Sequence, residues 1–300
     1  MKYSYFICDV FTDCQFGGNQ LAVFPEANGL TDPQMQQIAR EFNFAETTFV
    51  FPAKAGHTRQ VRIFTPAREV PFAGHPNLGT AFVLVSQGLV GNPGQRSLLE
   101  FEEGAAIVRV SVVPDDSGLL HCELTATQGI KLGLEVPVPD VASALSLQAG
   151  QIAVQTHRPR VASVGLPFVM VELVDRKALE SARINAEGFD QIASLGIMPD
   201  IHMYVQSRDE FDLRTRMFAP HDGVPEDAAT GSANCALAAL LASLEPQTNG
   251  QFSWRIAQGV EMGRPSILYA SAEKQAGRVN EVRIAGNCAL FASGVAMIGT

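Results

Sequence analysis

The chain has 300 residues, of which 46% are hydrophobic and 18% charged. It can therefore bury a large core, which excludes a disordered segment and a small disulfide-stapled scaffold. The net charge of −9 comes without any basic run, which argues against nucleic acid and anionic membranes as partners. The five cysteines are scattered and form no C-x-x-C motif, which is typical of a reducing compartment.

The two ends of the chain show no targeting or membrane signal. Asp9 and Asp13 precede any long apolar run, so the N-terminus does not resemble a signal peptide. The longest uncharged stretch, residues 284–300, is shorter than the ~20 residues that a membrane helix needs. We predict that it forms a hairpin of two buried strands that turns at Gly286-Asn287. We expect a soluble, cytoplasmic protein.

In chain order, the first half predicts a helix, two strands and a second helix. Thr31 is a suitable N-cap and Pro33 suits the first turn of a helix that extends to Phe42. Strands are predicted at residues 44–51 and 58–65. A helix follows at residues 76–86, and its Leu, Ala, Phe and Val side chains leave no polar face.

The second half predicts the same elements at residues 187–195, 201–206, 211–218 and 230–244. Its last helix, which includes Ala-Leu-Ala-Ala-Leu-Leu at 236–241, also lacks a polar face. A helix that is apolar all round is buried on all sides. Each half should therefore wrap a curved sheet around its own central helix.

The order of these elements reflects an internal repeat at a shift of 154 residues. A period of half the chain is too long for a solenoid and favours two similar domains. We predict a first domain at residues 1–126 with the tail 283–300, a second at 127–282, and a link near residues 127–139, which are rich in Gly and Pro. The matching segments are Gln37-Ile38-Ala39 with Gln191-Ile192-Ala193, Phe49-Val50-Phe51 with Met203-Tyr204-Val205, and Arg62-Ile63-Phe64-Thr65-Pro66 with Arg216-Met217-Phe218-Ala219-Pro220.

Both buried helices begin in small, turn-forming sequence, Phe72-Ala73-Gly74-His75-Pro76 and Asp227-Ala228-Ala229-Thr230-Gly231-Ser232. The free N–H groups of a buried helix start need a partner, and two such ends opening on one cleft would suit a small carboxylate. The alternative is that Thr230 and Ser232 cap their own helix and that His75 is a cap or core histidine.

Other chemical sites find little support in the sequence. The six histidines form no H-x-x-x-H pair, and neither a phosphate loop nor a G-x-G-x-x-G motif after a strand is present. Gly17-Gly18-Asn19 is typical of a turn. Glu46, between a helix and an apolar strand, is either a solvated strand-end carboxylate or, if it faces an apolar cleft, a group suited to proton abstraction and return.

At these residues the chain resembles the PhzF family of phenazine-biosynthesis-like isomerases. The resemblance spans nearly the whole chain. It rests on Asp9-Val10-Phe11-Thr12 with Gly18-Asn19, Phe44-Ala45-Glu46-Thr47-Thr48-Phe49, Arg62-Ile63-Phe64-Thr65-Pro66, Pro71-Phe72-Ala73-Gly74-His75-Pro76 with Gly79-Thr80-Ala81, and Glu226-Asp227-Ala228-Ala229-Thr230-Gly231-Ser232-Ala233.

The resemblance implies an α+β, diaminopimelate epimerase-like fold with two pseudo-symmetric halves, each a barrel-like sheet around a central helix. It implies that Glu46 is the acid/base, that His75, Asp227 and Ser232 line the site between the halves, and that backbone groups at Gly74 and Gly231 contribute. It also implies a homodimer that uses no metal or organic cofactor. The chain departs from the family pattern at Ala228, where a proline is common, so we expect the loop that carries Asp227 to differ in stiffness.

Three functions remain open at this stage. The first is a cofactor-independent isomerase in which Glu46 moves a proton between carbons of a small carboxylate-bearing substrate. The second is an epimerase or racemase of an amino or hydroxy acid, with Asp227 as the second acid/base. The third is a binding protein without activity. A racemase with two thiols is disfavoured, because the first helix start has no cysteine and Cys235 lies inside the second helix.

Overall fold

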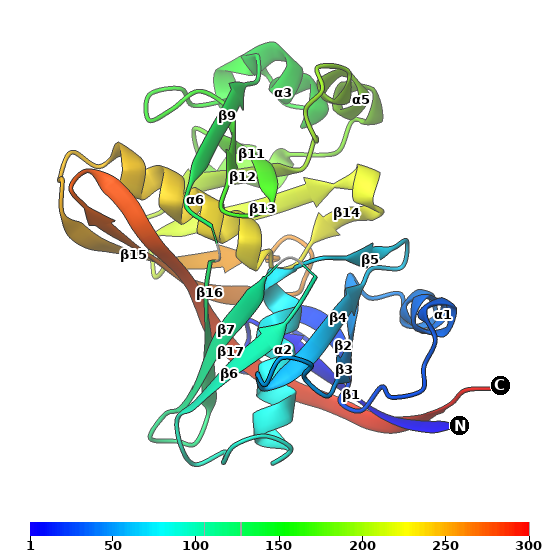
Figure 1. Ribbon diagram of the computed structural model, residues 1–300. Coiled ribbons are helices and arrows are strands. Elements are labelled where there is room, and N and C mark those ends of the chain that lie inside the picture. Colours follow the sequence, from blue (N-terminus) through cyan, green and yellow to red (C-terminus); the bar gives the residue numbers. More distant parts are fainter. Residues whose placement is uncertain (105, 127, 300) are drawn as a thin grey trace. The chain divides into compact units, whose positions relative to one another are not determined.

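The computed structural model describes residues 1–104, 106–126 and 128–299 (Figure 1). The chain divides into two compact units, Met1–Thr127 with Ala285–Thr300 and Gln128–Ile284. The last strand, β17 (Arg278–Met297), begins in the second unit and ends in the first.

The first unit is a closed barrel around a helix. Its strands pair in the cyclic order β1–β2–β3–β4–β6–β7–β8–β17 and back to β1, with the β2–β3 and β4–β6 pairs parallel. Its elements before β17 are β1 (Lys2–Val10), β2 (Asn19–Phe24), α1 (Asp32–Phe42), β3 (Glu46–Phe51), β4 (Arg59–Phe64), β5 (Glu69–Val70), α2 (Gly74–Ser86), β6 (Ser97–Glu102), β7 (Ile107–Pro114) and β8 (Leu120–Thr125).

Helix α2 is buried along nearly its whole length and packs against strands β1, β2, β3, β7 and β8 (Figure 1, cyan). Its sequence has no polar face, so burial on all sides is its stable arrangement. At Gly79 the helix lies so close to the sheet that an added Cβ would be 2.6 Å from the Leu21 side chain and 2.7 Å from Val10. Glycine at this position therefore sets how deeply α2 enters the barrel.

The second unit repeats this plan. Its strands pair in the order β9–β10–β11–β12–β13–β15–β16, with β11–β12 and β13–β15 parallel, and α6 packs on β10, β11, β15 and β16. Its elements are β9 (Lys131–Glu135), α3 (Val138–Ala144), η1 (Ala149–Gln151), β10 (Arg160–Ser163), β11 (Pro167–Glu172), α4 (Arg176–Ser181), α5 (Ala186–Ser194), β12 (Ile201–Gln206), β13 (Leu213–Ala219), η2 (Pro220–Asp222), β14 (Val224–Asp227), α6 (Gly231–Leu244), β15 (Gly250–Gln258) and β16 (Ser266–Gln275).

The strand register supports the repeat seen in the sequence. Thr48 pairs with Ile63 across β3 and β4, and His202 pairs with Met217 across β12 and β13. Both members of the second pair lie 154 residues after those of the first. The sequence shift is therefore also the shift between equivalent positions in the two sheets.

The predicted C-terminal hairpin is wrong. Gly286 and Asn287 lie within the continuous strand β17, and the carbonyl of Asn287 accepts hydrogen bonds from the backbone N–H groups of Phe11 and Thr12. Pairing with β1 on one side and β8 on the other keeps the strand extended through a sequence that is typical of turns. Tertiary pairing thus overrides the local preference.

The predicted link at 127–139 also differs from the structure. Residue 127 lies outside the described residues, while β9 occupies residues 131–135 and α3 starts at Val138. The Gly133 position lets β9 pass close to β10, because an added Cβ would lie 2.9 Å from Val161. This glycine therefore serves strand packing, which a count of Gly and Pro does not reveal.

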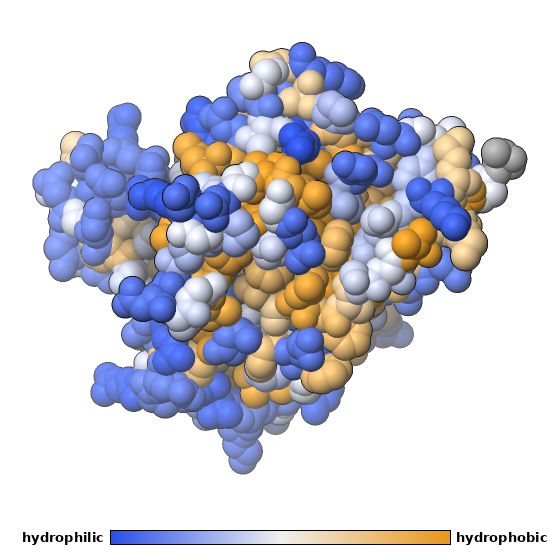
Figure 2. Space-filling model, turned by 90° about the horizontal axis from the view of Figure 1, so that it is seen from below, coloured by the Kyte–Doolittle hydropathy of each residue, from blue (hydrophilic) through white to orange (hydrophobic). Residues whose placement is uncertain are grey.

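Some apolar side chains remain at the surface, and Figure 2 shows such an area on the face seen from below. Near the end of β17, Phe291 and Val295 are exposed, as is common for apolar atoms in folded proteins. In the part of the chain that the structure describes, no helix is long and apolar enough to cross a membrane.

The C-terminal end of α6 is held by a buried lysine. The ammonium group of Lys274 donates hydrogen bonds to the carbonyls of Ala242 (3.1 Å), Ser243 (3.2 Å) and Glu245 (2.7 Å). These are carbonyls that a helix leaves unpaired, and a cation there also offsets the partial negative charge of the helix end.

We expect Lys274→Met to lower the free energy of unfolding by about 3 kcal/mol, because three buried or partly buried carbonyls lose the ammonium donor. The exposed Lys177 on α4 is the matched control, and Lys177→Met should change stability by less than about 0.5 kcal/mol. Urea denaturation of the two variants checks this. Equal stabilities would contradict the role given to Lys274.

Candidate functional site

Glu46 and His75 lie together in the first unit. The αL conformation of Asn43 ends α1 and directs the chain into β3, whose first residue is Glu46. His75 is the second residue of α2 and is buried, whereas Glu46 is half-buried. The His75 Nε2 atom lies 3.5 Å from Glu46 Oε2, without the geometry of a hydrogen bond. Among the described residues, His75 Nε2 has no hydrogen-bond partner although the Glu46 carboxylate is next to it.

His75 is uncharged at neutral pH. Burial lowers its pKa to about 3, although the backbone carbonyl of Gln20 partly opposes this effect. A neutral imidazole can both donate and accept a proton, which a permanently charged group cannot. The interpretation of His75 as a helix cap is not supported, because the start of α2 has no side-chain cap.

Asn19 was missed as a site residue, since its Gly-Gly-Asn setting is typical of a turn. It is the buried first residue of β2 and pairs with Val10 of β1. Its Nδ2 atom lies 3.3 Å from the Nδ1 atom of His75. The contact orients the imidazole from the side opposite Glu46. Only the three-dimensional closeness of β2 and α2 reveals it, because 56 residues separate the two side chains.

In the second unit, the loop before α6 holds Asp227 in place. The Thr230 hydroxyl donates a 2.6 Å hydrogen bond to Asp227 Oδ2. The fully buried Gln258 donates through Nε2 to the Asp227 carbonyl and to Thr230 Oγ1, both at 2.9 Å, and accepts through Oε1 from the Thr230 N–H. Gln258 therefore anchors the loop. It was not predicted, because an isolated Gln at the end of a strand gives no sequence signal.

The departure from the family pattern at Ala228 leaves this loop anchored. The Ala228 carbonyl accepts a 2.9 Å hydrogen bond from the Ser266 hydroxyl, and Ala228 itself is buried. An added Cβ at Gly259 would lie 2.5 Å from the same carbonyl, and the backbone of Gly259 is left-handed. Close packing on both sides thus constrains the loop without a proline.

The starts of α2 and α6 are built alike. Neither has a side-chain cap, so the interpretation of Thr230 as the cap of its own helix is wrong; its hydroxyl bonds Asp227 instead. Gly74 and Gly231 are the first residues of the two helices. His75 and Ser232 follow them at equivalent positions. Uncapped N–H groups beside small residues are suited to an anionic group.

Cys235 is not suited to proton transfer. It is buried in α6, and burial raises the pKa of its thiol to about 12. Among residues 1–104, 106–126 and 128–299, no group of three or more His, Cys, Asp or Glu side chains is arranged to hold a metal ion.

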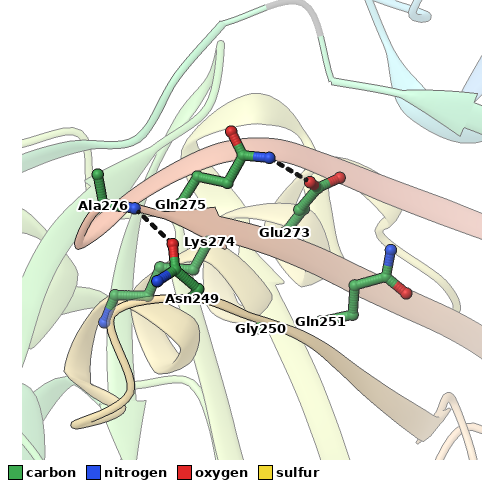
Figure 3. Close-up of a pocket in the computed structure, with 7 residues that line it drawn as sticks. All are labelled: Asn249, Gly250, Gln251, Glu273, Lys274, Gln275 and Ala276. Atoms are coloured by element: carbon green, nitrogen blue, oxygen red, sulfur yellow. Dashed lines mark hydrogen bonds between the residues drawn. The ribbon is translucent and has the colours of Figure 1, made fainter.

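A surface pocket of about 460 Å³ in the second unit contains none of the predicted site residues (Figure 3). Lys274, which bonds the carbonyls at the C-terminal end of α6, is one of its lining residues. The 14 residues of α6 separate this end from the Asp227 loop by ~20 Å. The lining residues are Asn249, Gly250, Gln251, Glu273, Lys274, Gln275 and Ala276.

Comparisons with known proteins agree with the resemblance seen in the sequence. The model of the family described as phenazine biosynthesis-like protein (PhzC-PhzF) matches residues 8–294. A trans-2,3-dihydro-3-hydroxyanthranilate isomerase of Pseudomonas aeruginosa is 36% identical over 299 residues, which cover 99% of this chain and 100% of that protein. The resemblance predicted from the motifs is thereby confirmed.

Solved structures confirm the epimerase-like fold. A PhzF-family protein of Bacillus anthracis matches with a TM-score of 0.90 and 23% identity, over 99% of this chain and 100% of that one. A predicted epimerase of Pseudomonas aeruginosa matches with a TM-score of 0.81 and 29% identity, over the same shares of the two chains. The predicted α+β fold with two barrel-like halves is therefore correct.

The buried network beneath the Asp227 loop makes stability dependent on pH. His202 is fully buried, its Nε2 lies 3.2 Å from Asn234 Oδ1, and burial lowers its pKa to about 4. Between pH 6.5 and 4 the unfolded chain binds a proton at this histidine that the folded chain does not. The free energy of unfolding therefore falls as the pH falls through this range.

Between pH 6.5 and 4, we expect His202→Gln to reduce the fall in the free energy of unfolding by up to roughly 3 kcal/mol. The fall that is due to His75 should remain. Urea denaturation of both proteins across this range measures it. Parallel stability curves for the variant and the unmodified protein would show that His202 is not responsible.

Proposed function

The chain belongs to the phenazine biosynthesis-like protein family and is an isomerase, and on this basis we propose that Glu46 moves a proton between carbons of a small carboxylate-bearing substrate. The main support for the proposal is the Glu46–His75 pair, which lies at the starts of β3 and α2. A half-buried carboxylate beside a neutral imidazole can take a proton from carbon and return it elsewhere.

We propose complementary roles for the remaining site residues. His75 exchanges protons with, or hydrogen-bonds, polar groups of the substrate. Asp227, oriented by Thr230 and Gln258 in the loop before α6, does the same. The substrate carboxylate binds backbone N–H groups at Gly74 and Gly231 and the Ser232 hydroxyl. The uncapped helix starts support this assignment.

The proposed substrate class follows from these groups and from the relatives. The 36% identical isomerase of Pseudomonas aeruginosa is named after trans-2,3-dihydro-3-hydroxyanthranilate, which bears a carboxylate and is the first compound to assay. The proposed reaction requires no metal or organic cofactor. The homodimer stays a prediction.

Glu46→Gln should lower kcat by a factor of ~10²–10⁴, because the amide cannot accept the proton. The KM should change little, since the amide keeps the shape of the side chain. Steady-state kinetics on a confirmed substrate measure both parameters. Glu41→Gln, on the exposed face of α1, is the matched control and should retain unmodified turnover. Near-normal kcat in the Glu46 variant would disprove the acid/base assignment.

Solvent deuterium separates a proton shift from an epimerisation, which Asp227 could support as a second acid/base. In D2O, an epimerase should label the inverted carbon fully, while a shift in which Glu46 returns the same proton should label the product weakly. Mass spectrometry of the product at low conversion gives the answer. Full labelling at a carbon whose configuration is inverted would replace the proposed reaction by the alternative.

A further inference from the structure

The internal repeat places a glutamate where the other half has Gln258. In the parallel pair β13–β15, Leu213, Arg214 and Thr215 stand beside Ile256, Ala257 and Gln258. In β4–β6, Arg59 and Gln60 stand beside Phe101 and Glu102. Since Arg59 and Gln60 lie 154 residues before Leu213 and Arg214, Glu102 corresponds to Ala257 and the next residue, Glu103, corresponds to Gln258.

The neighbours of the two residues correspond as well. Asn77 Nδ2 donates to the Ala73 carbonyl at 2.8 Å, and Asn234 Nδ2 donates to the Thr230 carbonyl at 3.0 Å, each one turn into its helix. Asn234 also donates to Gln258 Oε1 at 2.8 Å. The amide of Asn77 is close enough to Glu103 to lower the pKa of its carboxyl group, although Asn77 Oδ1 and both Glu103 oxygens have no hydrogen-bond partner among the described residues. Two helix starts thus rest on equivalent pairs of side chains.

The two pairs differ in the number of hydrogen-bond donors that their side chains contain. Gln258 has an amide group, and both of its atoms are fully used. A Glu103 carboxylate would have only acceptors. Both of its oxygens and Asn77 Oδ1 are buried, and none has a hydrogen bond of good geometry among the described residues. One proton on Glu103 provides the missing donor and makes its side chain an isostere of Gln.

The environment of Glu103 favours the protonated form of its carboxyl group. Burial raises the pKa of Glu103 to about 8, and Asn77 opposes this only in part. No charged side chain in the described chain contributes to the shift. The ionisable groups on the elements around Glu103 have other partners or are neutral: His75 on α2, Arg59 and Arg62 on β4, Glu69 on β5, Arg109 on β7, and Glu100 and Glu102 on β6.

We propose that Glu103 is a positioning residue for the proposed reaction: as a neutral carboxylic acid it holds Asn77, and through Asn77 the start of α2 that carries His75, as Gln258 holds the loop before α6. Ionisation of Glu103 removes the proton that it donates to Asn77 Oδ1 and leaves a buried negative charge beside that oxygen. The proposal rests on the proposed function for its effect on turnover. Its effect on stability is independent of any substrate.

The first test is the pH dependence of kcat/KM. Above pH 8 the value for the unmodified protein should fall, approaching ~tenfold per pH unit, as Glu103 ionises. Glu103→Gln should retain activity at pH 7 and lose this alkaline decline, whereas Glu103→Leu should lose more than ~tenfold at every pH, because it offers no donor to Asn77 Oδ1. Glu102→Gln, whose carboxylate bonds the N–H groups of Lys54 and Ala55, should keep the decline. An unchanged decline in Glu103→Gln, or full activity in Glu103→Leu, would overturn the proposal.

The second test needs no substrate. Because the folded pKa of Glu103 lies above the unfolded value, the free energy of unfolding should fall as the pH rises from about 4.5 to 8. Glu103→Gln should remove this fall in urea denaturation, and Gln258→Glu should introduce a similar one. The effect of Glu103 on stability does not depend on the acid/base role of Glu46. The proposed function and the role of Glu103 can therefore be disproved separately. A pH dependence that is unaltered in Glu103→Gln would overturn the proposal by itself.

Discussion

The structure depends on the burial of two helices that have no polar side. An apolar helix is stable only when a sheet surrounds it, and burial then removes its first N–H groups from bulk water. In α2 and α6 no side chain caps these groups. The same two helix starts thus belong to the barrel cores and, in the proposed function, bind the substrate carboxylate.

Most of the elements, and the repeat that relates them, could be predicted from the sequence because their signals are local. The cap at Thr31 and the alternation of apolar residues place α1, and β12 has the predicted bounds. The hairpin expected at Gly286-Asn287 failed because the pairing of β17 with two distant strands outweighs a local turn signal. A single sequence contains no record of such long-range pairing.

The residues of the candidate site also fall into two groups, those that the sequence could predict and those that only the fold reveals. Glu46, His75 and Asp227 stand in recognisable motifs, whereas Asn19 and Gln258 act through contacts across 56 and 31 residues that only the fold creates. Supporting residues of this kind need only a polar group at the right place, so their identity can change between the halves. Gln258 and Glu103 show how two residues of equal shape occupy one structural position with different acid–base behaviour.

The path of β17 has a consequence for the order in which the protein forms. This strand pairs with β1 from Lys2↔Met297 to Val10↔Cys288, and it also borders β8. During synthesis the first barrel thus lacks one strand until residues 278–297 have left the ribosome. The second unit, whose residues 128–284 are made earlier, can fold before it. The half that contains Glu46 and His75 is made first and completed last.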